Sequence, residues 1–158
     1  MKTLIVYTTK YGSTKTCAEK IREKLNTDTV IVNLKNNKKP NVAEYDTVII
    51  GGSIHAGRIQ GQIKRFCSTQ EKTLLEKKIG LFICCMYEGE QAQKQFEEAF
   101  PERLREHAAA RGILGGILDF DKMNFVERMV VKKVAGVEES HFKLSEEKID
   151  AFARELQN

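Results

Sequence analysis

The sequence lacks the features of several protein classes. No apolar run approaches the ~20 residues that a helix needs to cross a bilayer. The chain begins Met-Lys and enters an apolar run without the hydrophobic region of a secretory signal, so we expect a cytoplasmic protein. The four cysteines fit no CxxC or Cys/His spacing, which predicts no metal site. The net charge is only +4 and is dispersed, which does not indicate nucleic-acid binding.

The length and composition fit a single folded domain over residues 1–158. A chain of 158 residues can bury a substantial core. Its composition, 41% apolar and 30% charged, is ordinary for a soluble globular protein. Neither internal repeats nor low-complexity linkers interrupt it.

Apolar runs alternate with helical patterns along the chain. Runs that are apolar on consecutive residues are typical of strands buried on both faces of a parallel sheet. We expect five strands, at residues 4–7, 30–32, 48–50, 81–86 and 113–118. Helical patterns cover residues 15–26, 62–67, 91–110 and 145–156. Pro101 should kink or break the third helix, and residues 35–45 read as a polar linker without a helix. The alternation predicts an α/β fold with right-handed crossovers.

Three segments with unusual loop chemistry follow predicted strands. They span residues 8–14, 51–61 and 87–91. Ligands of such sheets bind outside the carboxyl ends of the strands, so we expect the three loops to meet at one site.

The first loop is rich in hydroxyl groups around one glycine. It is neither a Walker motif nor a GxGxxG motif. Neutral hydroxyl donors, backbone N–H groups and a helix N-terminus suit a terminal phosphate monoester. A purely structural strand–turn–helix is the alternative. The candidate ligand contacts here are Thr9, Lys10, Tyr11, Gly12, Ser13 and Thr14.

This first segment resembles the flavodoxin family. The resemblance rests on Ile5-Val6-Tyr7, Thr9, Gly12, Thr14, Ala18 and Ile21. It implies a flavodoxin-like three-layer sandwich with a five-stranded parallel sheet, and flavin mononucleotide (FMN) as the cofactor.

The second and third loops then lie where flavodoxin-like proteins cover the two faces of the flavin ring. In the second loop the resemblance points to Ser53, Ile54, His55, Ala56 and Gly57, where glycine permits close backbone approach. His55 is a candidate catalytic residue that donates to the flavin or moves a proton, or else it is a solvent-facing loop residue. The third loop offers Met86, Tyr87, Glu88 and Gly89.

Tyr87 is the candidate for stacking on the flavin, although a tyrosine at a strand end can also be a rim residue. Cys84 and Cys85 precede it on a strand and should point to opposite faces. That arrangement disfavours a vicinal disulfide and favours core packing over redox chemistry.

Residues 119–140 form a basic amphipathic stretch. Its apolar residues are Met123, Val126, Met129, Val130 and Val134, and its basic residues are Arg128, Lys132 and Lys133. Such a helix can lie peripherally on an anionic membrane, here the inner face of the cell membrane, or dock a partner. Alternatively, its apolar face completes the core.

Over nearly its full length the chain also resembles menaquinone-dependent protoporphyrinogen oxidase, a flavodoxin-like enzyme family of bacterial haem synthesis. The resembling segments are residues 1–5, 45–46, 48–51, 53–54, 116–118, 125–133 and 152–155. The resemblance implies a porphyrinogen substrate and a quinone acceptor.

Positive charge predicted near the flavin also favours an oxidoreductase. Lys10, His55 and Arg58 would stabilise a reduced, anionic flavin, and Arg58, Lys64 and Arg65 could hold propionates. Three hypotheses follow. The first is an FMN-dependent protoporphyrinogen dehydrogenase-like oxidoreductase, the second a flavodoxin that carries electrons between protein partners, and the third a flavin-fold binding protein without turnover.

Overall fold

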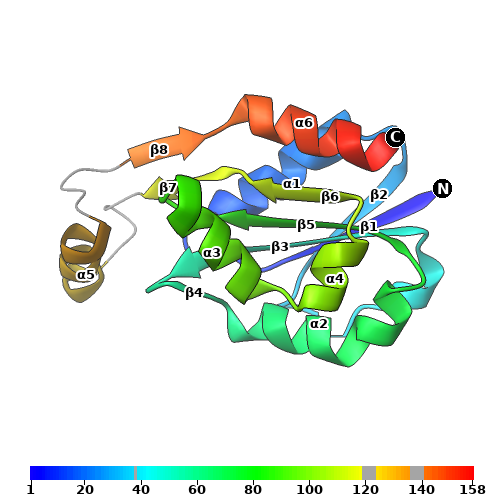
Figure 1. The fold of residues 1–158 in the computed structure, drawn as a ribbon, viewed down its shortest axis with the longest axis horizontal. Helices are drawn as coiled ribbons and strands as arrows, with labels where there is room; N and C mark the ends of the chain where they lie inside the picture. The colour runs from blue at the N-terminus through cyan, green and yellow to red at the C-terminus, as the bar shows by residue number, and fades with distance from the viewer. Residues whose placement is uncertain (38, 119–123, 136–140) are drawn as a thin grey trace.

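The central feature of the structure is a parallel β-sheet of five strands in the order β2-β1-β3-β5-β6 (Figure 1). The structure is a computed structural model that describes residues 1–37, 39–118, 124–135 and 141–158. The strands are β1 (Lys2–Tyr7), β2 (Asp28–Asn33), β3 (Thr47–His55), β5 (Lys78–Cys84) and β6 (Ala110–Ile113). This confirms the predicted flavodoxin-like α/β class.

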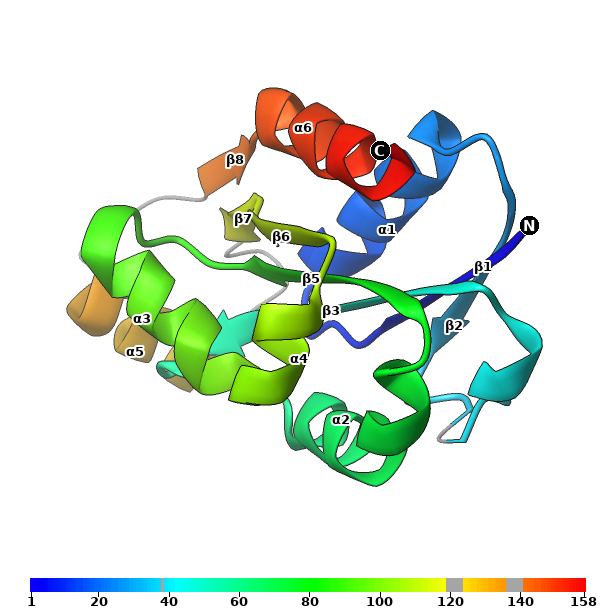
Figure 2. The same ribbon diagram turned by 45° about the vertical axis from the view of Figure 1, so that its right-hand side comes forward.

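Helices cover both faces of the sheet (Figure 2). Helices α1 (Ser13–Lys24) and α6 (Glu146–Gln157) lie side by side on one face. Helices α2 (Gly61–Leu74), α3 (Gly89–Ala99) and α4 (Glu102–His107) cover the other. Ion pairs from Lys20 to Glu146 and from Lys24 to Asp150 join α1 to α6 across the surface.

The consecutive apolar residues of the central strands explain this layering, because alternate side chains enter opposite cores. Leu4 and Val6 pack toward α2, whereas Ile5 and Tyr7 pack toward α1 and α6. Two neighbouring cysteines divide in the same way. Cys84, the last residue of β5, packs in the core on the α1–α6 side, and Cys85, the next residue, packs in the core on the α2 side. The prediction that they point to opposite faces is therefore confirmed.

Close packing at β3 requires a glycine. A Cβ atom on Gly51 would lie 2.0 Å from the ring of Phe82, which is fully buried. The ring of Phe82 in turn meets Phe152 of α6 edge-on, at 5.8 Å between centroids.

The structure corrects the predicted elements around residues 91–118. The expected helix is broken at Pro101 into α3 and α4, as predicted, but it ends at His107. The fifth strand occupies residues 110–113 instead of 113–118. Gly115, at φ 86°, turns the chain out of the sheet into β7 (Gly115–Leu118), which pairs antiparallel with β8 (His141–Leu144).

Two further short elements were not predicted. Strand β4 (Arg58–Ile59) forms a hairpin with β3, and a single 3₁₀ turn, η1 (Val42–Glu44), interrupts the polar linker. Neither changes the layering of the fold.

Helix α5 (Phe125–Ala135) projects from the body of the molecule at the end where β3 and β4 meet (Figure 1). Phe125, Val126 and Met129 are 75%, 67% and 56% exposed, so these side chains do not complete the core. That alternative is wrong for them, and Glu127 is the residue that joins α5 to Lys10 and Tyr11 of the body. Met123, with residues 119–123 and 136–140, lies outside the described residues. Within the described ranges, no helix has both the length and the apolar character needed to span a bilayer.

Candidate functional site

The first loop turns sharply from β1 into α1. Gly12 makes this turn possible, since its φ of 102° lies in the left-handed region that other residues rarely adopt. The backbone N–H of Gly12 donates to Thr9 Oγ1 at 2.9 Å and closes the turn. The first turn of α1 contains no acidic residue, and no side chain caps it. The partial positive charge of its backbone N–H groups is therefore not balanced by a carboxylate of that turn.

The hydroxyl of Thr14 provides the test of whether a phosphate fits here. Thr14 is fully buried, and its Oγ1 has no hydrogen-bond partner among the described residues. A buried hydroxyl without a partner costs about 1–3 kcal/mol, and native proteins rarely leave one. An acceptor from a bound ligand would remove that cost. Together with the glycine turn and the helix N-terminus, Thr14 therefore fits the phosphate of FMN.

The second loop is fixed by a hairpin and by one glutamine. Ala56 at φ 51° and Gly57 at φ 79° form the tight turn between β3 and β4. The side chain of Gln60 bonds Ser53 twice. Its Oε1 accepts from the Ser53 backbone N–H at 3.1 Å, and its Nε2 donates to Ser53 Oγ at 2.7 Å. These bonds hold Ser53 in place at the end of β3.

His55 contacts the same serine, with its Nε2 3.0 Å from Ser53 Oγ. Burial, followed by the positive charges of Lys10 and Lys35, lowers the pKa of His55 from 6.5 to about 4. His55 is therefore uncharged at neutral pH. The expectation that it adds positive charge near the flavin is wrong, because burial disfavours the imidazolium.

Side-chain contacts bring the first two loops together. The rings of Tyr11 and His55 meet edge-on at 5.4 Å between centroids. Thr8, at the end of β1, donates its hydroxyl to Gln62 Oε1 of α2 at 3.2 Å. The predicted convergence is thus present for these two loops.

Two charged residues from distant segments also reach the first loop. Lys35 Nζ donates to the carbonyl of Thr9 at 2.9 Å. Glu127 of α5 pairs with Lys10 Nζ at 2.6 Å and accepts from the Tyr11 hydroxyl. Lys10 lowers the pKa of Glu127, which keeps the carboxylate ionised. Sequence reasoning missed Lys35, Gln62 and Glu127, because each acts through a long-range contact without a local signal. It also missed Gln60, which reaches Ser53 across the β3–β4 hairpin.

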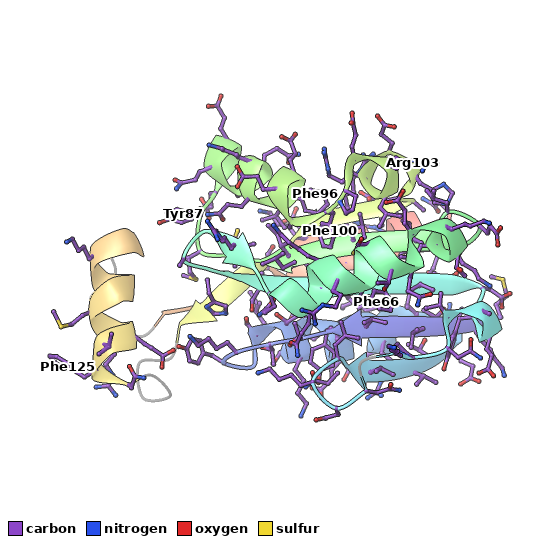
Figure 3. All side chains as sticks on the ribbon, turned by 90° about the horizontal axis from the view of Figure 1, so that it is seen from below. Phe66, Tyr87, Phe96, Phe100, Arg103 and Phe125 are labelled. Atoms are coloured by element: carbon purple, nitrogen blue, oxygen red, sulfur yellow. The ribbon has the colours of Figure 1, made fainter. Side chains whose placement is uncertain are left out.

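The third loop leaves the sheet beside the second, since Cys84 of β5 is in register with Ser53 of β3. Gly89 at φ 64° turns it into α3. Tyr87 is partly buried against the core on the α2 side and lies at the same end of the molecule as α5 (Figure 3). The loop borders a small pocket of about 160 Å³ shared with Gly116 and Lys148. The stacking role of Tyr87 and the contacts of Met86, Glu88 and Gly89 stay predictions, as do those of Ile54 and the other loop residues.

The cysteines behave as core residues. Cys17 Sγ lies 3.4 Å from Cys84 Sγ behind the first loop, and both side chains are almost completely buried. The contact with Cys84 and burial raise the pKa of the Cys17 thiol, so the reactive thiolate is disfavoured. Burial also raises the pKa of Cys67 to about 12 and that of Cys85 to about 11.

Comparison with known proteins identifies the family. The Flavodoxin domain family matches residues 4–145. The chain belongs to the flavodoxin domain family. FMN, predicted from the sequence, is the cofactor of that family. No protein of curated function matches the sequence significantly.

Several solved flavodoxins share the fold of this flavodoxin-domain protein. Oxidised flavodoxin 1 from Bacillus cereus is 16% identical, with a TM-score of 0.59 over 99% of this chain and 97% of that one. Fusobacterium nucleatum flavodoxin bound to FMN is 14% identical, with a TM-score of 0.58 over 99% and 96%. A short-chain flavodoxin associated with a PDU bacterial microcompartment is 15% identical, with a TM-score of 0.62 over 99% and 97%. At these identities the similarity establishes the fold.

Proposed function

We propose that this flavodoxin-domain protein binds FMN and carries electrons between redox protein partners. The observation that supports it best is the buried, unpartnered hydroxyl of Thr14 beside the left-handed turn at Gly12. Both stand at the N-terminus of α1 in a chain of the flavodoxin domain family. Bound FMN supplies one- and two-electron redox chemistry.

In this proposal the chain's own residues bind and orient the cofactor. Thr14, Ser13 and the first N–H groups of α1 would hold the phosphate. Ser53, held by Gln60, would present the backbone of the second loop to the flavin ring. His55 has a pKa of about 4, so at neutral pH it is uncharged and only a weak base, and it would contact the flavin as a neutral hydrogen-bond partner.

The first experiment is a visible absorption spectrum of freshly purified protein, followed by anaerobic redox titration. An electron carrier should be yellow and should show two well-separated one-electron potentials. It should also pass electrons to a protein acceptor such as cytochrome c. A colourless protein that does not bind added FMN would contradict the proposal and favour a flavin-fold protein without turnover.

A second candidate function is an FMN-dependent oxidoreductase of haem biosynthesis that oxidises a porphyrinogen and reduces a quinone. Two observations favour it. Arg58, Lys64 and Arg65 are all exposed and could pair with propionates. The exposed apolar residues of α5, which is tethered to the first loop through Glu127, would suit contact with an apolar quinone or a membrane surface.

An assay of porphyrinogen-dependent quinone reduction distinguishes the two functions. The enzyme should reduce the quinone when a porphyrinogen is present. In the redox titration, its flavin should take up two electrons in a single step. Replacing Arg58 with Gln should then raise KM for the porphyrinogen, whereas Arg22→Gln, an exposed cation on α1, should leave it unchanged. If the yellow protein shows no porphyrinogen-dependent turnover, the oxidoreductase function is contradicted and the carrier function is the one that remains.

A further inference from the structure

A pocket of about 440 Å³ lies between the segment after β2 and helix α2, outside the site described above. The residues that line it are Leu34, Lys39, Gln62, Arg65, Phe66, Thr69 and Gln70. None of them is among the predicted flavin contacts, and Arg65 is the one that the second candidate function also uses. Phe66 lies on α2 (Figure 3), one turn after Gln62, whose side chain bonds Thr8.

The floor of this pocket is apolar and fixed. Leu34 is 2% exposed and Phe66 is 4% exposed, so both belong to the core on the α2 side. A rigid apolar floor of this kind can hold the hydrophobic body of a small ligand.

The rim of the pocket is positively charged. Lys39 and Arg65 both line it, and no acidic residue does so among the described residues. Neither forms an ion pair within the described part of the chain, in contrast to Lys10, Lys20 and Lys24. Two cations beside one cavity, without a carboxylate to balance them, favour an anion there.

Among the polar groups of the lining, the amide of Gln62 reinforces this preference, because its oxygen already accepts a hydrogen bond. Gln62 Oε1 accepts the Thr8 hydroxyl, which leaves the two N–H donors of its amide nitrogen. Thr69 donates its hydroxyl hydrogen to the carbonyl of Arg65 at 2.9 Å. The remaining donors of the rim come from the guanidinium, the ammonium and the amide groups.

We propose that this pocket binds a small amphipathic anion, with a carboxylate or phosphate between Lys39 and Arg65 and an apolar body over Leu34 and Phe66. The site is separate from the flavin site and goes beyond the proposed function. Its volume lies at the lower end of the range for small-molecule sites. Guanidinium and ammonium groups bind both carboxylates and phosphates, so the experiment below decides which of the two the pocket prefers.

The test uses ¹⁵N-labelled full-length protein, with and without added FMN, titrated with 2-naphthoate, 2-naphthyl phosphate and the uncharged 2-naphthamide. We expect one or both anions to shift the backbone amide signals of Leu34, Phe66 and Thr69 saturably. The amide should bind about tenfold more weakly, because it lacks the charge-assisted bonds. The anion that binds more tightly identifies the headgroup.

Two variants make the test specific. Arg65→Gln and Lys39→Gln should each weaken binding of the anion about fivefold to tenfold. Lys72→Gln is the matched control, since Lys72 is another exposed cation of α2 and does not line the pocket.

The proposal is overturned if the amide binds as tightly as the acids, if Arg65→Gln and Lys72→Gln have equal effects, or if the shifts fall only on residues 9–14. The result does not depend on flavin binding, because the pocket signals are followed with and without FMN. A failure here is therefore distinguishable from a failure of the proposed function.

Discussion

The buried hydroxyl of Thr14 makes a prediction in which two measurements change in opposite directions. Replacing Thr14 with Val keeps the shape of the side chain and removes only the hydroxyl. In FMN-free protein this hydroxyl is fully buried and lacks a partner among the described residues, so its removal should stabilise the fold. In FMN-bound protein the same change should remove a hydrogen bond to the phosphate.

The magnitudes follow from the desolvation of one hydroxyl. An unsatisfied buried polar group costs about 1–3 kcal/mol, so Thr14→Val should stabilise the FMN-free protein by about 1 kcal/mol or more. For a domain of this size, that raises Tm by about 2–4 °C per kcal/mol. A hydrogen bond to a charged group contributes about 1.5–3 kcal/mol, so the affinity for FMN should fall roughly tenfold to a hundredfold.

The assays are thermal unfolding of the FMN-free protein and titration of FMN followed by quenching of its fluorescence. Thr16→Val is the control, because Thr16 lies in the same helix and its hydroxyl bonds the carbonyl of Gly12 at 3.1 Å. This control should not raise Tm, and its affinity for FMN should stay near that of the wild type. A Thr14→Val protein with lower Tm and unchanged affinity for FMN would refute the reasoning.

Three further predictions concern the core, the histidine and the thiols. Gly51→Ala should lower the free energy of unfolding by about 1–3 kcal/mol in urea melts, because its Cβ would lie 2.0 Å from Phe82. The control Gly61→Ala should not lower it, because a Cβ there would have no neighbouring atom within 4 Å. Between pH 6.5 and about 4 the unfolded state binds a proton that folded His55 does not, so stability should fall as pH falls, and His55→Gln should flatten that slope. The four free cysteines are buried, so none should react with a thiol reagent at about pH 8 until denaturant is added, and rapid reaction of the native protein would contradict their core role.

The sequence predicted the parts of this protein that depend on local patterns. Consecutive apolar residues indicated β1, β3 and β5, Pro101 marked the break between α3 and α4, and Gly12 among hydroxyls indicated the turn from β1 into α1. Residues 115–118 were misassigned to the sheet, because the turn at Gly115 and the pairing with β8 are not visible in a local apolar run.

The candidate site was predictable only in outline. The loops could be located, yet the bonds that fix them could not. Gln60 bonds Ser53 within the hairpin, whereas Gln62 and Glu127 contact Thr8 and Lys10 from distant segments. The charge of His55 was also unpredictable, since burial and the approach of two lysines set its pKa.

The pairing of α1 with α6 has a consequence for how the protein is made. A nascent chain that has just passed β6 already contains the first loop, but α1 still lacks the neighbour that covers the Phe82 side of the sheet. Until α6 leaves the ribosome, that apolar face stays open to chaperones. We therefore expect the cofactor to be captured only after α6 has packed against α1.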